Sequence, residues 1–316
     1  MLIASLWLVG GLLFLALGAE GLVRGASSAG RRVGISPLVI GLTVVAYGTS
    51  APELVVSLHA AIGGNPDIAI GNVVGSNISN IGLILGLVAV MVPIRIQAHV
   101  LRLDVAFMIA ASALFLGLVW DGVIGRLNGL VLIAGACMYT VICVWSAREE
   151  TTSTVRQSFD DDVVDERSIL YDLTAGVVGL LLLVLGARFL VTGAVQIAEA
   201  AGLSTLVIGL TVVAVGTSLP ELATSAVAAL RGHADLALGN VLGSNIFNLV
   251  GILGVTAAVH PLDASGVMWL DAGVMFGFAA LTLPLFWTKY TFSRWEGALL
   301  ITGYVGYVGA LLWGVA

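Results

Sequence analysis

Uninterrupted apolar segments of about 20 residues recur along the whole chain, and they restrict what it can fold into. A helix of that length crosses the ~30 Å hydrocarbon core of a lipid bilayer. Breaks at glycine, proline and charged clusters separate ten such segments. They lie at residues 2–23, 37–62, 67–92, 103–120, 127–146, 169–191, 205–230, 235–259, 267–287 and 296–315. We therefore predict an all-α polytopic membrane protein with ten transmembrane helices.

The charge content excludes a water-soluble protein. Only 10% of the residues are charged, whereas soluble domains contain about a quarter. No basic or aromatic cluster indicates a nucleic-acid partner. The first apolar segment has no basic region before it, so we expect a retained span rather than a signal peptide. We expect no obligate protein partner, and the lipid bilayer is the surrounding medium.

Two copies of one polar motif lie within the apolar segments. Gly48-Thr49-Ser50-Ala51-Pro52-Glu53 and Gly216-Thr217-Ser218-Leu219-Pro220-Glu221 are related by an offset of 221 − 53 = 168 in the numbering. The same offset relates Gly71-Asn72 to Gly239-Asn240, and Gly75-Ser76-Asn77 to Gly243-Ser244-Asn245. An ionisable residue at membrane depth is costly, so two at equivalent positions indicate function.

This duplication divides the ten spans into two halves of five, residues 1–146 and 169–316, joined by a linker at 147–168. Because five is an odd number, the second half must enter the membrane from the opposite side. We predict an inverted-topology repeat with broken helices 2, 3, 7 and 8. This architecture is typical of secondary transporters, which bind their substrate near the bilayer midplane.

The distribution of basic residues predicts the orientation. Eleven of the 13 Lys and Arg residues follow odd-numbered spans, and only Arg126 and Arg188 lie elsewhere. Since Lys and Arg gather on the cytoplasmic side, both termini should lie outside and the 147–168 linker should be cytoplasmic. The acidic cluster in that linker, Asp160-Asp161-Asp162, is interpreted as a solvated charge run, with a cation sensor as the alternative.

The prolines of the two motifs release oxygen ligands. A proline within a helix cannot donate to the carbonyl four residues earlier, so Pro52 frees the Gly48 carbonyl and Pro220 frees that of Gly216. At membrane depth such groups persist only where protein or a watery cavity satisfies them. We therefore expect each break to face an internal site.

The polar residues around the breaks form a set suited to hard cations. Thr49 and Glu53 are four apart, as are Ser76 and Asn80, so each pair shares a helix face. The second half repeats this with Thr217 and Glu221, and with Ser244 and Asn248. Carboxylate, amide and hydroxyl oxygens suit Ca²⁺, whereas softer metals prefer nitrogen or sulfur. Two glutamates would neutralise one Ca²⁺ or be shared by several Na⁺ ions.

Several other polar residues admit structural interpretations. Asn77 and Asn245 are interpreted as interhelical hydrogen-bond partners rather than ligands. Asp67 and Asp235 stand at predicted helix starts, where a carboxylate is favourable. His59 has no counterpart in the second half, and we expect a packing or interfacial role. Glu20 is equivalent to Arg188, which leaves a structural ion pair as an open interpretation.

The segments GTSAPE…GNVVGSNISN and GTSLPE…GNVLGSNIFN closely resemble the cation/calcium exchanger superfamily, in its prokaryotic sodium/calcium exchanger branch. The resemblance covers both repeats and the five-plus-five layout. It implies Ca²⁺ extrusion driven by inward Na⁺, with Glu53 and Glu221 as central ligands. It also implies surrounding ligands at Thr49, Ser50, Ser76, Asn80, Thr217, Ser218, Ser244 and Asn248, and outer Na⁺ positions at the backbone carbonyls of Ala46 and Ala214.

The resemblance refines the coupling ion and the mechanism. The Gly-Thr-Ser before each glutamate favours sodium over the proton-coupled branch, and Asn248 stands where some members, including potassium-dependent ones, carry Asp. Spans 1 and 6 resemble the family's gating pair, whose sliding past the other eight spans would switch access. We expect a Na⁺/Ca²⁺ antiporter of the plasma (inner) membrane, with no cofactor and no enzymatic activity.

Three alternatives are open at this stage. The first is H⁺/Ca²⁺, or other divalent cation, exchange with a glutamate as proton carrier. The second is a channel. The third is an intramembrane hydrolase that uses Ser50 or Ser218 with His59. The symmetry of the two serines argues against the third, since one nucleophile and one base would be needed.

Overall fold

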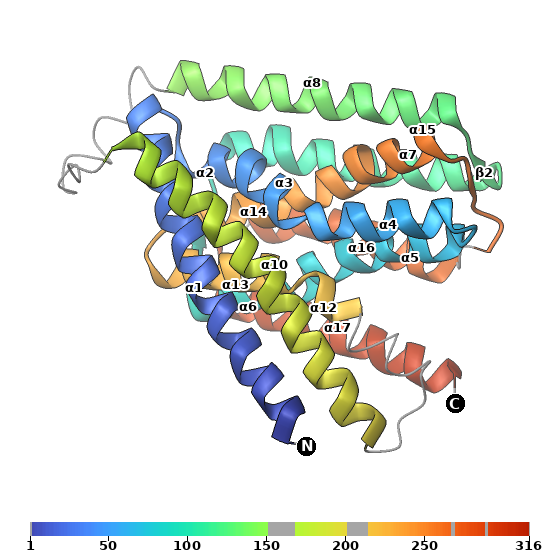
Figure 1. Cartoon of the computed structure of the whole chain (residues 1–316). Coiled ribbons are helices and arrows are strands. Elements are labelled where there is room, and N and C mark those ends of the chain that lie inside the picture. The colour runs from blue at the N-terminus through green and yellow to red at the C-terminus, as the bar shows by residue number, and fades with distance from the viewer. Residues whose placement is uncertain (1, 151–167, 201–213, 267–268, 288–289, 316) are drawn as a thin grey trace.

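The computed structural model describes residues 2–150, 168–200, 214–266, 269–287 and 290–315, and over these the chain is predominantly helical (Figure 1). Short π-helical segments carry the label η. In chain order the elements are α1 (Leu2–Val33), α2 (Pro37–Ile40), η1 (Gly41–Val45), α3 (Ala46–Thr49), α4 (Ala51–Ile62), α5 (Pro66–Ser79), η2 (Asn80–Leu85), α6 (Gly86–Met91), β1 (Ile94–Arg95), η3 (Val100–Val105), α7 (Ala106–Trp120), β2 (Val123–Ile124), α8 (Arg126–Glu150), α10 (Ile169–Ala200), α12 (Ala214–Thr217), α13 (Leu219–Leu230), α14 (Ala234–Ile246), η5 (Phe247–Ile252), α15 (Leu253–Val259), β3 (Leu262–Asp263), α16 (Trp269–Trp287), β4 (Thr291–Phe292) and α17 (Arg294–Val315).

Membrane-length helices account for most of the described chain. Eight are long and apolar enough to cross a bilayer, and the bent pair Pro37–Thr49 and Ala51–Ile62 makes a ninth. These nine agree with nine of the predicted spans. The remaining one, 205–230, begins in residues outside the described ranges, and its second part is α12 and α13. The predicted linker also lies largely outside them.

The helices α1 and α10 are longer than predicted, with 32 residues each. At 1.5 Å per residue each is about 48 Å long, which exceeds the hydrocarbon thickness and requires a tilt or an extension beyond it. The first helix continues past the predicted end at residue 23 to Val33. Arg24 lies within it with its side chain largely exposed, and it forms an ion pair with Glu20, one turn earlier on the same helix.

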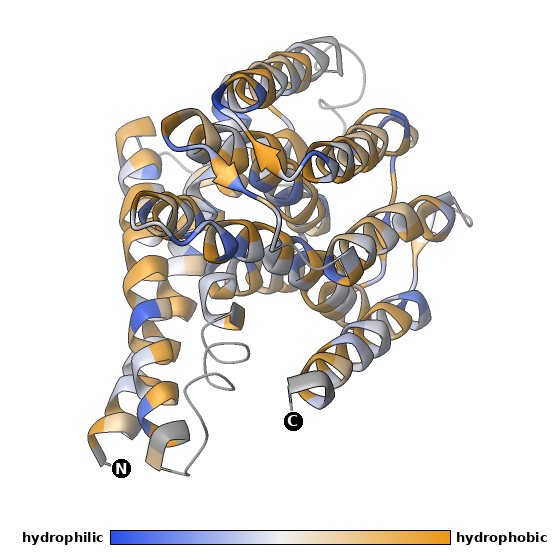
Figure 2. Cartoon of the chain, turned by 90° about the vertical axis from the view of Figure 1, so that its right-hand side faces the viewer, coloured by the Kyte–Doolittle hydropathy of each residue, from blue (hydrophilic) through white to orange (hydrophobic). Residues whose placement is uncertain are grey.

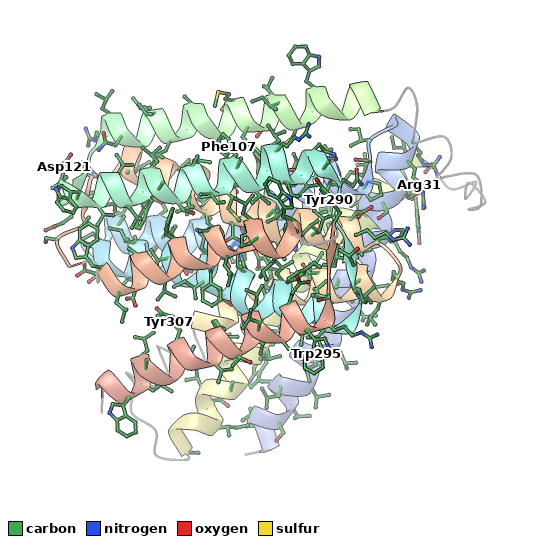
Figure 3. All side chains as sticks on the ribbon, turned by 180° about the vertical axis from the view of Figure 1, so that it is seen from behind. Arg31, Phe107, Asp121, Tyr290, Trp295 and Tyr307 are labelled. Carbon is green, nitrogen blue, oxygen red and sulfur yellow. The ribbon has the colours of Figure 1, made fainter. Side chains whose placement is uncertain are left out.

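Apolar residues predominate along the helices (Figure 2). Many large apolar side chains are exposed along the spans, which suits a lipid environment. Tryptophans gather where spans begin or end, and indole rings favour the level of the lipid headgroups. The exposed tryptophans at such positions are Trp120, Trp145, Trp269, Trp287, Trp295 and Trp313. Arg31 and Asp121, from loops predicted on opposite sides of the membrane, lie at opposite ends of the molecule (Figure 3).

The helices α1 and α10 lie side by side and cross the other helices at a steep angle (Figure 1). Glycines at seven-residue spacing line both helices where they touch. A Cβ on Gly18 would lie 2.7 Å from the Gly179 carbonyl oxygen, and one on Gly179 would lie 2.4 Å from the Leu22 nitrogen. Only glycine permits this backbone approach. We call this contact the glycine seam; it comprises Gly11, Gly18, Gly25, Gly179, Gly186 and Gly193.

The order of contacts in the glycine seam gives the relative direction of the two helices. Gly11 approaches Gly186, whereas Gly18, further along α1, approaches Gly179, which is earlier on α10. The two helices are therefore antiparallel. They are equivalent in the duplicated sequence, because Gly11 and Gly179 are related by the same offset as the two glutamates, 179 − 11 = 168.

Two short antiparallel strand pairs join loops of the two halves. β1 pairs with β4 through Ile94 and Phe292, and β2 pairs with β3 through Ile124 and Leu262. The offset of 168 carries Ile94 to Leu262 and Ile124 to Phe292, so each pair is the counterpart of the other with the halves exchanged. The loops paired in this way follow spans 3 and 9, and spans 4 and 8. The predicted topology places each of these two sets on one side of the membrane.

Glu20 joins α1 to the end of α13. Its carboxylate contacts the Arg231 guanidinium, with Nη2 to Oε1 at 2.5 Å and Nε to Oε2 at 3.0 Å. The Arg188 side chain, at the equivalent position of the second half, is exposed. Glu20 is therefore part of ion pairs, but its partners are Arg24 and Arg231 rather than its sequence counterpart Arg188.

Candidate cation site

The two duplicated glutamates lie at helix breaks inside the bundle. Helix α3 ends at Thr49 and α4 begins at Ala51, with a bend of 43° between the two parts of the span. Glu53 lies in the first turn of α4, and Glu221 in the first turn of α13, which follows a similar break at Ser218. Both glutamates are 1% exposed. A carboxylate there is favoured by the partial positive charge of a helix N-terminus.

Spans 3 and 8 differ from the prediction that they are broken. Each is one continuous helix of 26 residues. Within each, a π-helical segment replaces the expected break: η2 begins at Asn80, and η5 contains Asn248. The extra residue of a π-turn reshapes the backbone without ending the helix. Such segments are frequent at functional sites.

Side chains from both halves meet at the glutamates. The Ser50 hydroxyl donates to Glu221 Oε1 at 2.8 Å. Ser50 lies three residues before Glu53, so this bond brings the Glu221 carboxylate to the helix break that precedes Glu53. The two glutamates therefore lie where the halves meet, and neither faces lipid.

The amides of spans 3 and 8 also meet across the halves. Asn248 Nδ2 donates to Asn77 Oδ1 at 3.1 Å, so the nitrogen of this amide is committed to protein. Asn77 thus has the interhelical role that we expected. Asn245 instead donates to the Val241 carbonyl of its own helix at 2.8 Å.

Several buried oxygens around the glutamates have no hydrogen-bond partner. An unpaired buried polar atom is costly, and together these oxygens form a set that a hard cation would satisfy. Among the predicted ligands they are Glu53 Oε2, Glu221 Oε2, Ser76 Oγ, Asn80 Oδ1, Ser218 Oγ and Asn248 Oδ1.

The remaining predicted ligands either have protein partners or are the first and last residues of α12. The Ala46 carbonyl accepts from the Thr49 hydroxyl at 3.3 Å and from the Ser244 hydroxyl at 3.5 Å. Thr217 is half-buried at the end of α12. Ala214 begins α12, and its side chain is outside the described part of the chain.

Other polar residues named from the sequence lie away from this cluster. Asp67 and Asp235 occupy the first turns of α5 and α14, as expected for carboxylates at helix starts. His59 is exposed on α4, whereas Ser50 is fully buried. This separation provides no nucleophile and base in contact and argues against the hydrolase alternative.

Asn72 and Asn240 are residues to which our sequence reasoning gave no role. Each donates to the backbone carbonyl of one duplicated glutamate. The signal was present, because both belong to the motif that is repeated in the two halves. Polar residue type alone did not show that their partner would be a carbonyl rather than an ion.

Membrane-length helices around a buried cluster of carboxylate, amide and hydroxyl oxygens define an integral membrane protein of the ion-carrier class. The chain belongs to the sodium/calcium exchanger protein family, whose model matches residues 3–145 and 173–313. This is a family of transporters rather than of enzymes.

Individual relatives match over nearly their whole length. The sodium/calcium exchanger MaX1 of Methanosarcina acetivorans is 32% identical over 96% of this chain and 97% of its own. The inner membrane protein YrbG of Escherichia coli is 36% identical over 99% of this chain and 98% of its own. The solved structure of the sodium-calcium exchanger NCX_Mj has a TM-score of 0.82 and 32% identity, with 98% of this chain and 99% of that chain covered.

Proposed function

We propose that the protein is a secondary active antiporter that exchanges Na⁺ for Ca²⁺ across the plasma (inner) membrane by alternating access. The observation that carries the proposal is the burial of Glu53 and Glu221 where the two halves meet, with Ser50 donating to Glu221 and with an unpaired oxygen on each carboxylate. Membership of the sodium/calcium exchanger family supports the choice of ions. The ligand set would be these glutamates with the predicted hydroxyl, amide and carbonyl oxygens around them.

The charge of the site supports competition between the two ions. Two buried carboxylates carry −2 when ionised, which one Ca²⁺ or two Na⁺ would neutralise. Desolvating an uncompensated charge costs several kcal/mol. A carrier with bound ions is therefore neutral enough to switch between the two sides of the membrane. An empty carrier is held back because the negative charges of its two carboxylates are not compensated.

We propose ten spans in two inverted halves, residues 1–146 and 169–316, joined by a cytoplasmic linker at 147–168. The antiparallel contact between the equivalent helices α1 and α10 supports inversion. The reciprocal strand pairs support it as well. Both termini would lie outside, as the distribution of Lys and Arg indicates.

The packing of α1 and α10 supports the proposed access change. The glycine seam joins these two helices backbone to backbone, so we expect them to move as one unit. As the pair slides past the other helices, the contacts of α1 with α13 and of α10 with α12 would be replaced by contacts at other positions along these helices. Inverted halves provide two such positions, one open to each side of the membrane.

The coupling ion can be tested by flux in proteoliposomes. Uptake of radioactive Ca²⁺ is measured with an imposed gradient of Na⁺, of K⁺ or of pH, each applied alone. We expect uptake only when the Na⁺ concentration is higher inside the vesicles than outside. Uptake with a pH gradient in the absence of Na⁺ would replace our proposal with H⁺/Ca²⁺ exchange.

Asn77 provides a second test, because it holds the amide of a proposed ligand. Asn77→Ala removes the acceptor for Asn248 Nδ2, so the amide can rotate and present its nitrogen to the ion. We expect the Ca²⁺ concentration for half-maximal uptake to rise by roughly 10-fold. The matched control is Asn245→Ala at the equivalent position, whose amide bonds its own helix. Equal shifts in the two variants would contradict the role given to Asn77.

A further inference from the structure

Asn72 and Asn240 make the same two contacts in the two halves of the molecule. Asn72 Nδ2 donates to the Glu53 carbonyl oxygen at 3.1 Å and to Ser57 Oγ at 2.9 Å. Asn240 Nδ2 donates to the Glu221 carbonyl oxygen at 3.4 Å and to Ser225 Oγ at 2.9 Å. Because the arrangement occurs once in each half, it is not an accident of the packing in either one.

These contacts connect the helix that carries each glutamate to the helix that carries the other ligands. Asn72, Ser76 and Asn80 follow one another at four-residue spacing along α5 and the start of η2, and so share a helix face. The amide of Asn72 binds the first turns of α4 through a carbonyl and a hydroxyl. The distance between the Glu53 carboxylate and the Ser76 and Asn80 oxygens is thereby restricted.

Asn240 has a third contact, which crosses between the halves. The Thr49 hydroxyl lies 3.2 Å from Asn240 Oδ1 and 3.3 Å from the Ala46 carbonyl oxygen, so these two acceptors share its single proton. A hydroxyl that gives its proton to an amide oxygen keeps its lone pairs available for a cation. Asn240 is fully buried, so water does not compete for this bond.

We propose that Asn72 and Asn240 are positioning residues that set the spacing of the cation ligands and thereby the affinity for Ca²⁺. They act through the backbone of Glu53 and Glu221 and, for Asn240, through Thr49, without coordinating the ion themselves. The inference rests on the proposed function of this site. Partners of this kind, one step removed from the ion, change metal affinity by about 10- to 100-fold when they are removed.

The test uses Asn72→Ala and Asn240→Ala in the full chain, reconstituted in proteoliposomes. We expect the Ca²⁺ concentration for half-maximal Na⁺-driven uptake to rise by about 10- to 100-fold, with a smaller change in the maximal rate. Asn240→Ala should have the larger effect because it also loses the Thr49 contact. The matched control is Asn65→Ala, which removes an exposed amide that donates to the Gly63 carbonyl at 3.2 Å, away from the site.

Thermal unfolding of the detergent-solubilised protein separates positioning from simple loss of stability. We expect the Asn variants to need more Ca²⁺ to reach the stabilised state than Asn65→Ala does. If folded Asn72→Ala and Asn240→Ala keep the half-saturating Ca²⁺ of the unmodified protein in both measurements, the proposal is wrong.

Two further variants keep the proposal testable if an Asn variant does not fold. Ser57→Ala and Ser225→Ala remove one of the two acceptors and leave the asparagine in place, so a rise of a few-fold in half-saturating Ca²⁺ is expected; no change overturns the proposal. Glu221→Gln is measured in parallel. If Glu221→Gln retains transport, the proposed function of the site is wrong. If Glu221→Gln loses transport while the Asn and Ser variants keep the normal Ca²⁺ affinity, only the positioning role of the asparagines is wrong.

Discussion

Glu53→Gln and Glu221→Gln are each expected to abolish Na⁺-driven Ca²⁺ uptake while leaving the protein folded. Glutamine has nearly the same size and shape but replaces one carboxylate oxygen with a hydrogen-bond donor and removes a charge. A site with a single carboxylate would leave bound Ca²⁺ with an uncompensated positive charge in a buried position, which is costly. Since the number of charged ligands tunes Ca²⁺ affinity over decades, we expect binding to weaken by about 100-fold or more.

The measurement is radioactive Ca²⁺ uptake into Na⁺-loaded proteoliposomes, with thermal unfolding as the check on folding. Asp235→Asn is the matched control, because Asp235 is also a duplicated carboxylate but lies at the start of α14. It should retain exchange. Normal uptake by either glutamine variant would remove that glutamate from the site.

Gly18→Ala and Gly179→Ala are expected to disrupt the pairing of α1 with α10. A Cβ at Gly18 would lie 2.7 Å from the Gly179 oxygen and the Leu183 nitrogen. Backbone atoms cannot rotate away as a side chain can, so the helices must separate along the glycine seam. Overpacking typically costs about 1–3 kcal/mol. We expect a lower unfolding temperature, a reduced folded yield and slower exchange.

The same two helices provide matched controls for these glycine variants. A Cβ at Gly10 would meet only Phe189 Cδ2, at 3.9 Å, and one at Gly176 would meet nothing within 4 Å. Gly10→Ala and Gly176→Ala gain the same helix propensity, up to about 1 kcal/mol, without the collision. They should be neutral or stabilising. If Gly18→Ala and Gly179→Ala unfold at the same temperature as these controls, the glycine seam does not determine how the pair is joined.

Hydrophobic length and the duplicated motif made much of the fold predictable. Nine of the predicted spans appear as membrane-length helices or a bent pair within the described residues. The errors have local causes. The first span extends past its predicted end at residue 23, because a helix can continue through a charged residue such as Arg24 whose side chain is largely exposed. Spans 3 and 8 contain π-helical segments in place of the predicted breaks. A π-turn inserts one extra residue into a helix without ending it.

The sequence predicted which residues form the proposed site better than it predicted the hydrogen bonds between them. Glu53 and Glu221 stand out because charge at membrane depth and duplication are both visible in the chain. The bond from Ser50 to Glu221 and the bond from Asn248 to Asn77 join residues 171 positions apart. No local pattern indicates such a pairing, since it depends on how the two halves are packed together.

The sequence by itself determined the class of protein, the spans and the duplicated polar residues, because these follow from hydropathy, helix geometry and one constant offset between the halves. Only the tertiary structure decided which buried oxygens have no hydrogen-bond partner and which asparagines donate to the backbone carbonyl of a glutamate. A side chain's hydrogen bonds depend on the atoms that other helices bring within about 3 Å. At α14 glycine permits that approach, because a Cβ on Gly239 would lie 2.4 Å from the Leu38 carbonyl oxygen.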